Sequence, residues 1–437
     1  MAAGGERNRN AVHPAHTTAA AEPPASSAMR DPIERSVVGD RLGAATRIHL
    51  VRRFALVLLA AGLTAIGPAA AAGHTGGCGS RLPTAPRGLP WRIVIRTSCG
   101  AFVVRSSGKV EHRAVRPWAP SWVPVNASRP LPGTYMTRRH NYITLFRAGR
   151  VLWRSARPYP YTSSIAVGLH AVAWSTTRRD GTTGLLYLAR IGGAERRIGV
   201  GEDPLGFTRS GTLVTERWRG GSATLFLRHR DGAFATVLAR GVRAAAFDPD
   251  SWRILFVAPG RRLLSFDGPQ SRLLGRTAFS AGDWLQPIGG GLVGVFGSDG
   301  VRVFRGVGGF FASAPLRPPT RRHGGSTVDG TGLVGSPRGD AAAFATAWRR
   351  NVDVYRGVGT VWLLRPGDRR ATAVYRNRVH LGCGSVASLS WHGRWLLYAT
   401  SDERVVAIDT ASRRIVDVTQ TAHELPGRLA VFSTAWG

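Results

Sequence analysis

The chain has 437 residues, 43% of them hydrophobic, so it can bury a substantial core, which excludes disorder along its whole length. Its 55 glycines and 26 prolines follow no collagen-like period and favour an all-β protein rich in turns over a helical one. The formal charge of +33 comes almost wholly from arginine, because Lys109 is the only lysine among 59 basic residues. These arginines are spread through every segment, which argues against specific nucleic-acid binding.

The N-terminal region contains the pattern of an export signal. Residues 1–48 lack periodicity and are interpreted as a disordered leader or as a stretch upstream of the true start codon. Residues 49–72 combine basic residues, an apolar run and small residues before Ala72. The apolar run is shorter than the roughly 20 residues of a membrane span. We expect a secreted or cell-envelope protein whose signal is cleaved near Ala72 or retained as an anchor, followed by a linker at 73–87.

Residues 88–437 repeat one strand pattern, which the stretch 242–268 shows compactly. There an apolar run meets a Pro-Asp turn, and two further apolar runs follow, separated by a Gly-Arg turn. Comparable apolar strands recur about every 43 residues, beginning at Trp91, Thr134, Ala171, Thr212, Arg253, Gly291, Ala341 and Trp395. This period, without helical stretches, predicts a single all-β domain, a β-propeller of about eight four-stranded blades, or seven if one unit is misread.

The turns that precede these strands carry a family resemblance. They read TRSG at Thr208, DPDS at Asp248, SPRG at Ser336 and SWHG at Ser390, and the last unit continues as VVAIDTASRR. This pattern resembles the TolB-type, WD-like β-propeller repeat family, and the resemblance implies a propeller that contacts other proteins. Two stacked β-sandwiches would also give short strands with regular turns, although a sandwich does not need a repeated three-strand phrase.

The two ends of the repeat region complement each other. Residues 429–436 form an apolar strand with no partner sequence after it, whereas the first unit starts at Trp91 without an inner strand ahead of it. We therefore predict that the C-terminal strand is the innermost strand of the first blade and closes the ring.

Three cysteines in an exported chain allow one disulfide bond. Cys99 lies in the turn between the first two local strands of the opening blade, and Cys383 lies in the loop that enters the last blade. In propeller topology these loops share a face, and ring closure makes the two blades neighbours. We predict a Cys99–Cys383 bond, with Cys78–Cys99 as the alternative favoured by proximity in sequence.

No catalytic or metal-binding motif is present at a usable spacing. The sequence contains no HExxH, CxxC or GxSxG and no phosphate-binding loop, and its histidines are isolated. No cofactor or metal is therefore expected, and no catalytic residue is assigned.

The repeat is broken after Ser313 and after Trp348, and loops that converge over a propeller channel are a common place for ligands. The residues there could form a cationic and aromatic patch for a carboxylate, phosphate or sugar polymer; they are Arg321, Arg322, His323, Trp348, Arg349, Arg350 and Tyr355. We expect a monomeric, non-catalytic scaffold at the cell envelope that binds a protein or an anionic envelope polymer. The alternative is a propeller-based lyase or hydrolase that acts on an anionic or polysaccharide substrate.

Overall fold

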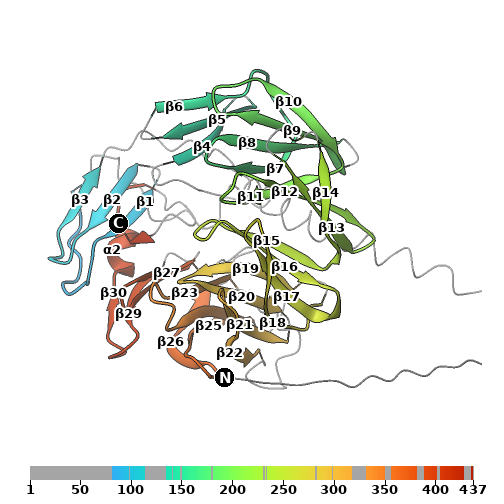
Figure 1. The fold of residues 1–437 in the computed structure, drawn as a ribbon. Coiled ribbons are helices and arrows are strands. Elements are labelled where there is room, and N and C mark those ends of the chain that lie inside the picture. The colour runs from blue at the N-terminus through green and yellow to red at the C-terminus, as the bar shows by residue number, and fades with distance from the viewer. Residues whose placement is uncertain are drawn as a thin grey trace, which may run out of the picture. The chain divides into compact units, whose positions relative to one another are not determined.

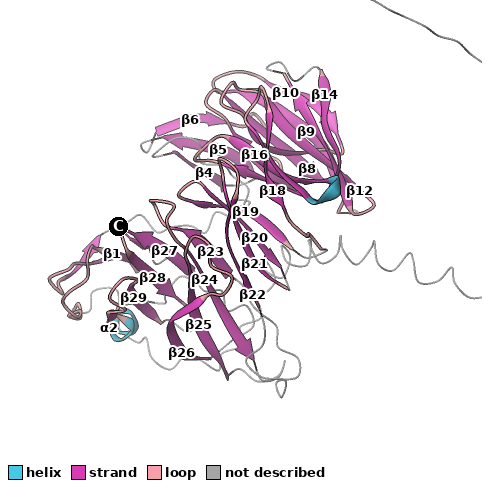
Figure 2. Ribbon diagram, turned by 60° about the horizontal axis from the view of Figure 1, so that its bottom comes forward, coloured by secondary structure: helices cyan, strands magenta, loops and turns pink. Residues whose placement is uncertain are grey.

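The computed structural model describes residues 81–97, 99–113, 134–139, 141–147, 150–178, 181–229, 232, 234–280, 283–297, 299–316, 331–349, 356–380, 388–400, 404–427 and 435–436. Strands dominate these residues (Figures 1 and 2). They form eight antiparallel sheets, seven with four strands and one with three. The protein is therefore an all-β propeller with eight blades, as the sequence period predicts.

The third to eighth blades each consist of four consecutive strands. The third and fourth blades contain β7 (Thr162–Val167), β8 (Ala171–Thr177), β9 (Thr183–Arg190) and β10 (Glu195–Val200), then β11 (Asp203–Phe207), β12 (Leu213–Arg219), β13 (Ser222–Arg228) and β14 (Ala235–Val242). The fifth and sixth contain β15 (Ala244–Asp248), β16 (Arg253–Ala258), β17 (Arg262–Phe266) and β18 (Ser271–Arg276), then β19 (Trp284–Gly289), β20 (Leu292–Gly297), β21 (Gly300–Arg305) and β22 (Phe310–Pro315). The seventh and eighth contain β23 (Thr331–Gly335), β24 (Ala342–Arg349), β25 (Arg356–Leu364) and β26 (Thr372–His380), then β27 (Ser388–His392), β28 (Trp395–Ala399), β29 (Val405–Asp409) and β30 (Ile415–Asp417). From β7 to β27, the first strands of successive blades contact one another.

The first blade is completed by the C-terminal strand. Its sheet has the order β3 (Val110–Arg113), β2 (Gly100–Val104), β1 (Ile93–Thr97) and β31 (Ala435–Trp436). Ile93 pairs with Trp436 and Val94 pairs with Ala435 in antiparallel register. Figure 1 shows the C-terminus beside the blue strands of this blade. The predicted ring closure is therefore confirmed for Ala435–Trp436, while residues 428–434 lie outside the described part.

The second blade has three described strands, β4 (Thr134–Arg139), β5 (Tyr142–Arg147) and β6 (Arg150–Arg154), instead of the four predicted. Residues 114–133, which precede β4, lie outside the described part of the chain.

The alternation of side chains along each strand explains why the strands are apolar throughout. In β16, Ile254 and Phe256 pack in a core shared with the fourth blade. The intervening Leu255 and Val257 pack in a core shared with the sixth blade. Successive side chains point to opposite faces of a sheet, and both faces of this blade are covered by a neighbour. An uninterrupted apolar run is the sequence signature of that arrangement.

The segments that flank the propeller differ from the prediction in two places. Leu82 and Ala85, predicted to be linker, pack against the core of the first and last blades, and Ala85 donates its N–H to the carbonyl of Gly108 over 2.9 Å. A short helix, α2 (Thr419–Glu424), follows β30, where no helix was predicted. The N–H of Thr419, the first residue of this helix, donates to Asp417 Oδ1 over 2.9 Å.

Candidate functional site

Most residues of the predicted cationic and aromatic patch lie outside the described part of the chain. These are Arg321, Arg322, His323, Arg350 and Tyr355. Their assembly into one patch stays a prediction. The insert that contains Arg321, Arg322 and His323 is shorter than the sequence predicts, because β22 continues to Pro315 and β23 begins at Thr331.

The prediction that Trp348 and Arg349 lie in a loop insert is wrong. Both belong to β24, in register with Val358 and Gly357 of β25. The pairing extends this far because β-branched and aromatic residues such as Thr346, Trp348 and Val358 favour extended backbone. The seventh blade therefore has longer strands at this hairpin, and the insert begins only after Arg349.

Cys99 lies in the turn between β1 and β2, as predicted, and forms a disulfide bond. Its two possible partners, Cys78 and Cys383, lie outside the described residues. The choice of Cys383 therefore stays a prediction. The same turn already contacts the end of the last blade, because Thr97 Oγ1 donates to the carbonyl of Pro426 over 2.6 Å.

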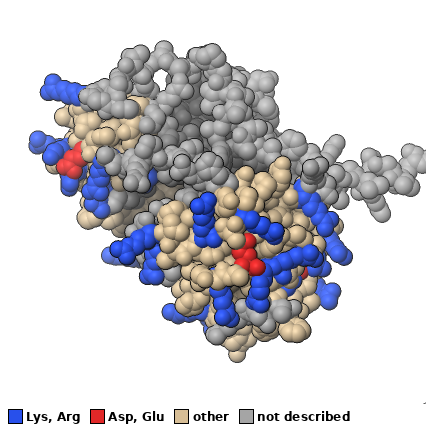
Figure 3. All heavy atoms as spheres, turned by 90° about the horizontal axis from the view of Figure 1, so that it is seen from above, with Lys and Arg blue, Asp and Glu red and all other residues tan. Residues whose placement is uncertain are grey.

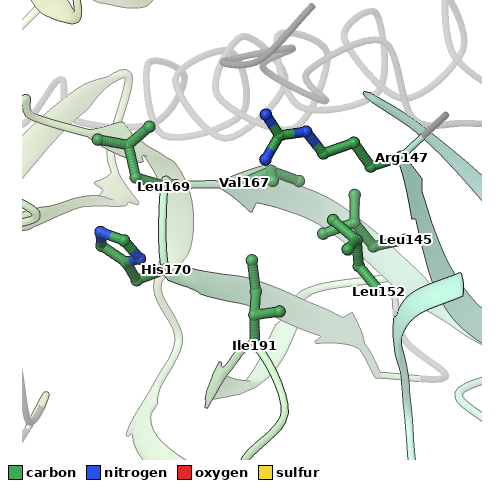
Figure 4. Close-up of a pocket in the computed structure, with 8 residues that line it drawn as sticks. Leu145, Arg147, Leu152, Val167, Leu169, His170 and Ile191 are labelled. Atoms are coloured by element: carbon green, nitrogen blue, oxygen red, sulfur yellow. The ribbon is translucent and has the colours of Figure 1, made fainter. Parts of the chain in front are cut away.

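A pocket of about 220 Å³ lies between the second and third blades (Figure 4). It opens where the β5–β6 hairpin meets the β7–β8 turn and the segment that follows β9. Its described lining consists of Leu145, Arg147, Leu152, Val167, Gly168, Leu169, His170 and Ile191. Five of these eight residues have branched apolar side chains, so apolar groups form the larger part of the described lining.

Two basic side chains lie at the rim of this apolar space. The guanidinium of Arg147 lies over Val167, and the ring of His170 lies beside Leu169 on the opposite side (Figure 4). Ile191 points into the space between them. Both Arg147 and His170 are exposed, and no described carboxylate forms an ion pair with Arg147. The site thus combines a predominantly apolar lining with hydrogen-bond donors that favour an anion.

The walls of the pocket belong to a rigid aromatic core. Leu145 and Val167 pack in the same cluster as Trp174 and Tyr187, whose rings stack with centroids 5.5 Å apart. Tyr159 completes this cluster, and its hydroxyl donates to Glu195 over 2.5 Å. Burial, together with this hydrogen bond, raises the pKa of Tyr159 above its ordinary value, so the phenol stays protonated.

The β7–β8 turn is fixed by a close contact with the next blade. A Cβ on Gly168 would lie 2.9 Å from Cγ of Phe207, the last residue of β11. The N–H of Gly168 donates to the carbonyl of Ala171 over 2.7 Å, and the carbonyl of His170 accepts from Ile191 over 2.9 Å. These contacts restrain the backbone of Gly168, His170 and Ile191, which line the pocket.

Comparison with known proteins gives a likeness of fold without a family. No protein-family model matches the chain, and no curated protein matches it in sequence. Among solved structures, the computationally designed Ika8 protein is 13% identical with a TM-score of 0.43, and the similarity covers 77% of this chain and 99% of Ika8. A eukaryotic initiation factor is 11% identical with a TM-score of 0.42, covering 76% of this chain and 85% of that protein. Hsv2 of Kluyveromyces lactis is 10% identical with a TM-score of 0.38, and the similarity covers 65% of this chain and 92% of Hsv2. At these values the likeness says nothing about function.

The described residues contain no group of three or more His, Cys, Asp or Glu side chains placed to hold a metal ion. Nor does any described helix have the length and hydropathy needed to cross a membrane.

Sequence reasoning did not find the pocket between the second and third blades. Leu145, Val167 and Ile191 have the same spacing and chemistry as core residues elsewhere in the repeat. The available signal is the basic residue at or beside an apolar strand end, since Arg147 is the last residue of β5 and His170 directly precedes β8. Whether Arg147 and His170 lie at one pocket depends on how the two blades pack, and the period of the repeat does not specify that packing.

Proposed function

We propose that the chain is an exported, non-catalytic binding protein, and that the pocket between the second and third blades takes a small anion joined to a compact apolar group. The observation that carries the proposal is the combination of a branched apolar interior with Arg147 and His170 at the rim. The described lining offers no carboxylate, hydroxyl or thiol side chain. Such a lining holds no side-chain nucleophile and no pair of acid–base groups beyond His170, which favours binding over covalent chemistry.

The size of the pocket limits its ligand. Water occupies about 30 Å³ per molecule in the liquid, so about 220 Å³ has room for a group of about seven heavy atoms. A branched carboxylic acid of five or six carbons has this size and both chemical properties. Small ligands of this kind bind weakly, and we expect a Kd of about 0.1–1 mM.

Two sources could supply the same chemistry, a free short-chain acid or the C-terminal leucine of a peptide. We would compare 4-methylpentanoate with N-acetyl-alanyl-leucine. The neutral 4-methylpentanamide serves as a third ligand that keeps the shape and removes the charge.

The test is a titration followed by methyl NMR, which reports directly on the Leu, Val and Ile side chains of the pocket. We expect the methyl signals of Leu145, Val167 and Ile191 to shift with at least one acid and to shift much less with the amide. Replacing Arg147 by Gln should weaken the acid about tenfold or more, because a charge-assisted hydrogen bond is lost. Arg150→Gln, an exposed arginine in the same hairpin that does not line the pocket, is the matched control.

Equal binding of the acid and the amide, or equal loss in the two arginine variants, would overturn the proposal. A shift with the peptide alone would identify a protein terminus as the ligand, and a shift with the free acid alone would identify a small molecule. Export rests on the pattern at residues 49–72, and N-terminal sequencing of the mature protein would distinguish cleavage near Ala72 from a retained anchor.

A further inference from the structure

Exposed arginines gather at one end of the fifth blade. Arg243 precedes β15, and its N–H donates to the carbonyl of Val257 at the end of β16 over 2.8 Å. Arg261 ends the turn from β16 to β17, and Arg262 begins β17. Arg276 ends β18 directly opposite Arg262 in the sheet register. All four arginines are exposed. Three separate segments of one blade therefore present guanidinium groups at the same end.

A fifth arginine reaches this end from the fourth blade. Arg240 lies near the end of β14, a strand that contacts the η2 turn (Pro259–Arg261). A Cβ on Gly241 would lie 3.1 Å from Cγ of Pro259, which shows how closely the two segments approach. We call the set Arg240, Arg243, Arg261, Arg262 and Arg276 the arginine end.

The charges of the arginine end are not neutralised within the described part of the chain. The ion pairs formed by the described residues involve other basic side chains. The nearby Asp299 pairs with Arg302, whose Nη1 also donates to Thr277 Oγ1 and to the carbonyl of Ala278. On the face drawn in Figure 3, too, blue basic side chains outnumber red acidic ones.

The carboxylates of this blade lie at its opposite end. Asp248 ends β15, Asp250 follows in the next turn, and Asp267 follows the end of β17. A five-residue strand spans roughly 17 Å, about twice the Debye length of about 8 Å at physiological salt. The aspartates therefore contribute little to the field at the arginine end, and the blade is electrostatically polarised along its strands.

The arginine end costs stability. Arg262 and Arg276 are paired across neighbouring strands, where like charges destabilise a sheet. Arg261 has a φ of 61°, a left-handed conformation that few residues other than glycine adopt. A cluster of charges without carboxylate partners, one of them on a residue with strained backbone, is a feature that an external anion would stabilise.

We propose that the arginine end binds a soluble linear polymer of phosphate groups. The guanidiniums project from three segments that do not line the described pocket, so they suit several linked anions better than one. The segments 240–243, 259–262 and 276–277 contain no aromatic residue on which a base could stack. Arginine recognises phosphate oxygens with paired hydrogen bonds, which suits a chain of phosphates at several points.

The test uses long-chain inorganic polyphosphate as the probe and the full mature domain as the protein. We expect binding whose salt dependence is steep, and replacement of all five arginines by Gln should weaken it at least tenfold at about 0.1 M salt. The slope of log K against log salt concentration should fall by about three, since each lost phosphate contact contributes somewhat less than one. The matched control replaces five exposed arginines in other blades, Arg113, Arg150, Arg190, Arg365 and Arg376, and should change the affinity less than threefold.

Equal weakening in both variants would overturn the proposal, because it would show a general charge effect. Competition by orthophosphate at the same phosphate concentration would also overturn it, as would equal affinity for polyglutamate or stronger retention on vesicles of phosphatidylglycerol. If the fivefold variant does not fold, the double variant Arg262→Gln/Arg276→Gln tests the same idea. It should melt at the same or a slightly higher temperature than the parent and still bind polyphosphate at least threefold more weakly.

Discussion

Two glycines, one in an inner strand and one in the turn after an inner strand, mark points where a side chain of the next blade crosses the backbone. A Cβ on Gly206 of β11 would lie 2.2 Å from Cδ2 of Phe247 of β15. Gly168 has the same relation to Phe207 one blade earlier. Neither glycine has a positive φ, so the requirement comes from packing between blades rather than from turn geometry. At these positions one added methyl group collides with a planar ring that has little room to move.

We expect Gly206→Ala to lower the free energy of unfolding by about 1–3 kcal/mol, the range found for overpacked cores. In the background of Phe247→Ala, where the ring is absent, the same substitution should cost much less. Chemical denaturation of the four proteins in this double-mutant cycle measures the coupling. Gly193→Ala, in the exposed turn between β9 and β10, is the control. Additive effects of Gly206→Ala and Phe247→Ala would contradict the packing argument.

Neighbouring blades are also joined by a buried ionic network at the connection between β10 and β11. Glu202 is 2% exposed and accepts hydrogen bonds from Thr215, Arg217 and Arg228 over 2.6–3.0 Å. Arg228, also buried, further donates to the carbonyl of Ile198 in β10 over 2.7 Å. The third and fourth blades therefore share one carboxylate that accepts hydrogen bonds from three side chains. Removal of one member of such a network leaves a charge buried without its partner.

Because the pKa of Glu202 is shifted, the contribution of this network to the stability of the fold depends on pH. Burial acts to raise the pKa, but the hydrogen bonds from Arg228 and Thr215 and the charges of Arg228 and Arg217 outweigh it, so the pKa lies below its ordinary value. Such a group stabilises the fold fully above its unfolded pKa of about 4.3 and loses this contribution as the pH falls through its folded pKa.

We expect Glu202→Gln to lower the free energy of unfolding by about 3–5 kcal/mol at pH 7. The difference from the parent should shrink as the pH falls below about 4, because the parent carboxylate becomes protonated there. Denaturant unfolding between pH 3 and pH 7 measures both quantities. Thr215→Val removes one neutral hydrogen bond to Glu202 and keeps all charges, so its effect on stability should be smaller and should change less with pH. A difference that is constant over this range would contradict the assigned role.

At the level of strands and turns, much of the fold follows from the sequence. The strands that begin at Ala171, Arg253 and Trp395 start where the repeat predicts, because apolar runs between Gly, Pro and Asp turns leave few alternatives. The turn at Ser336 also follows from the sequence. Ser336 Oγ accepts from the backbone N–H groups of Asp340 and Ala341 over 3.1 Å each, which closes the turn that begins with the SPRG sequence.

The functional surfaces could not be predicted in the same way. The pocket requires two blades to bring Arg147 and His170 to one space, and the arginine end requires a register that sets Arg262 opposite Arg276. A period of apolar residues specifies the order of the strands, but the positions of polar side chains depend on bulges and on packing between sheets. One such irregularity lies between Leu263 and Leu264, next to Arg262.

For the whole molecule, closure depends on contacts between the first and last blades. Ile93, Ile95 and Phe102 share one core with Leu397 and other residues of the last blade. Further contacts are the stacking of Trp91 on His392 with centroids 5.0 Å apart and the hydrogen bond from Thr421 Oγ1 to the carbonyl of Thr84 over 3.2 Å. The pairing of β31 with β1 adds the backbone hydrogen bonds and covers the edge of the first sheet.

Deletion of residues 428–437 should therefore weaken the ring without abolishing its shared core. We expect the melting temperature to fall by about 5 °C or more, given the loss of several hydrogen bonds and the exposure of a strand edge. Calorimetry measures the shift, and light scattering should detect association through the uncovered edge of β1. A point variant, Ala435→Pro, should shift the melting temperature in the same direction because proline cannot join the ladder. Melting of the truncated protein at the parent temperature would contradict a closing role for β31.

The pairing of β31 with β1 also constrains the order of assembly during synthesis. Among the described strands, β1 leaves the ribosome first and the strand that covers its edge leaves last. At about 5–20 residues per second, this interval lasts on the order of tens of seconds. During that time the apolar segment Ile93–Thr97 has an open edge in a nascent chain whose later blades can already fold. A chaperone that holds this segment until translation ends would therefore raise the yield of folded protein more than one that acts on the middle blades.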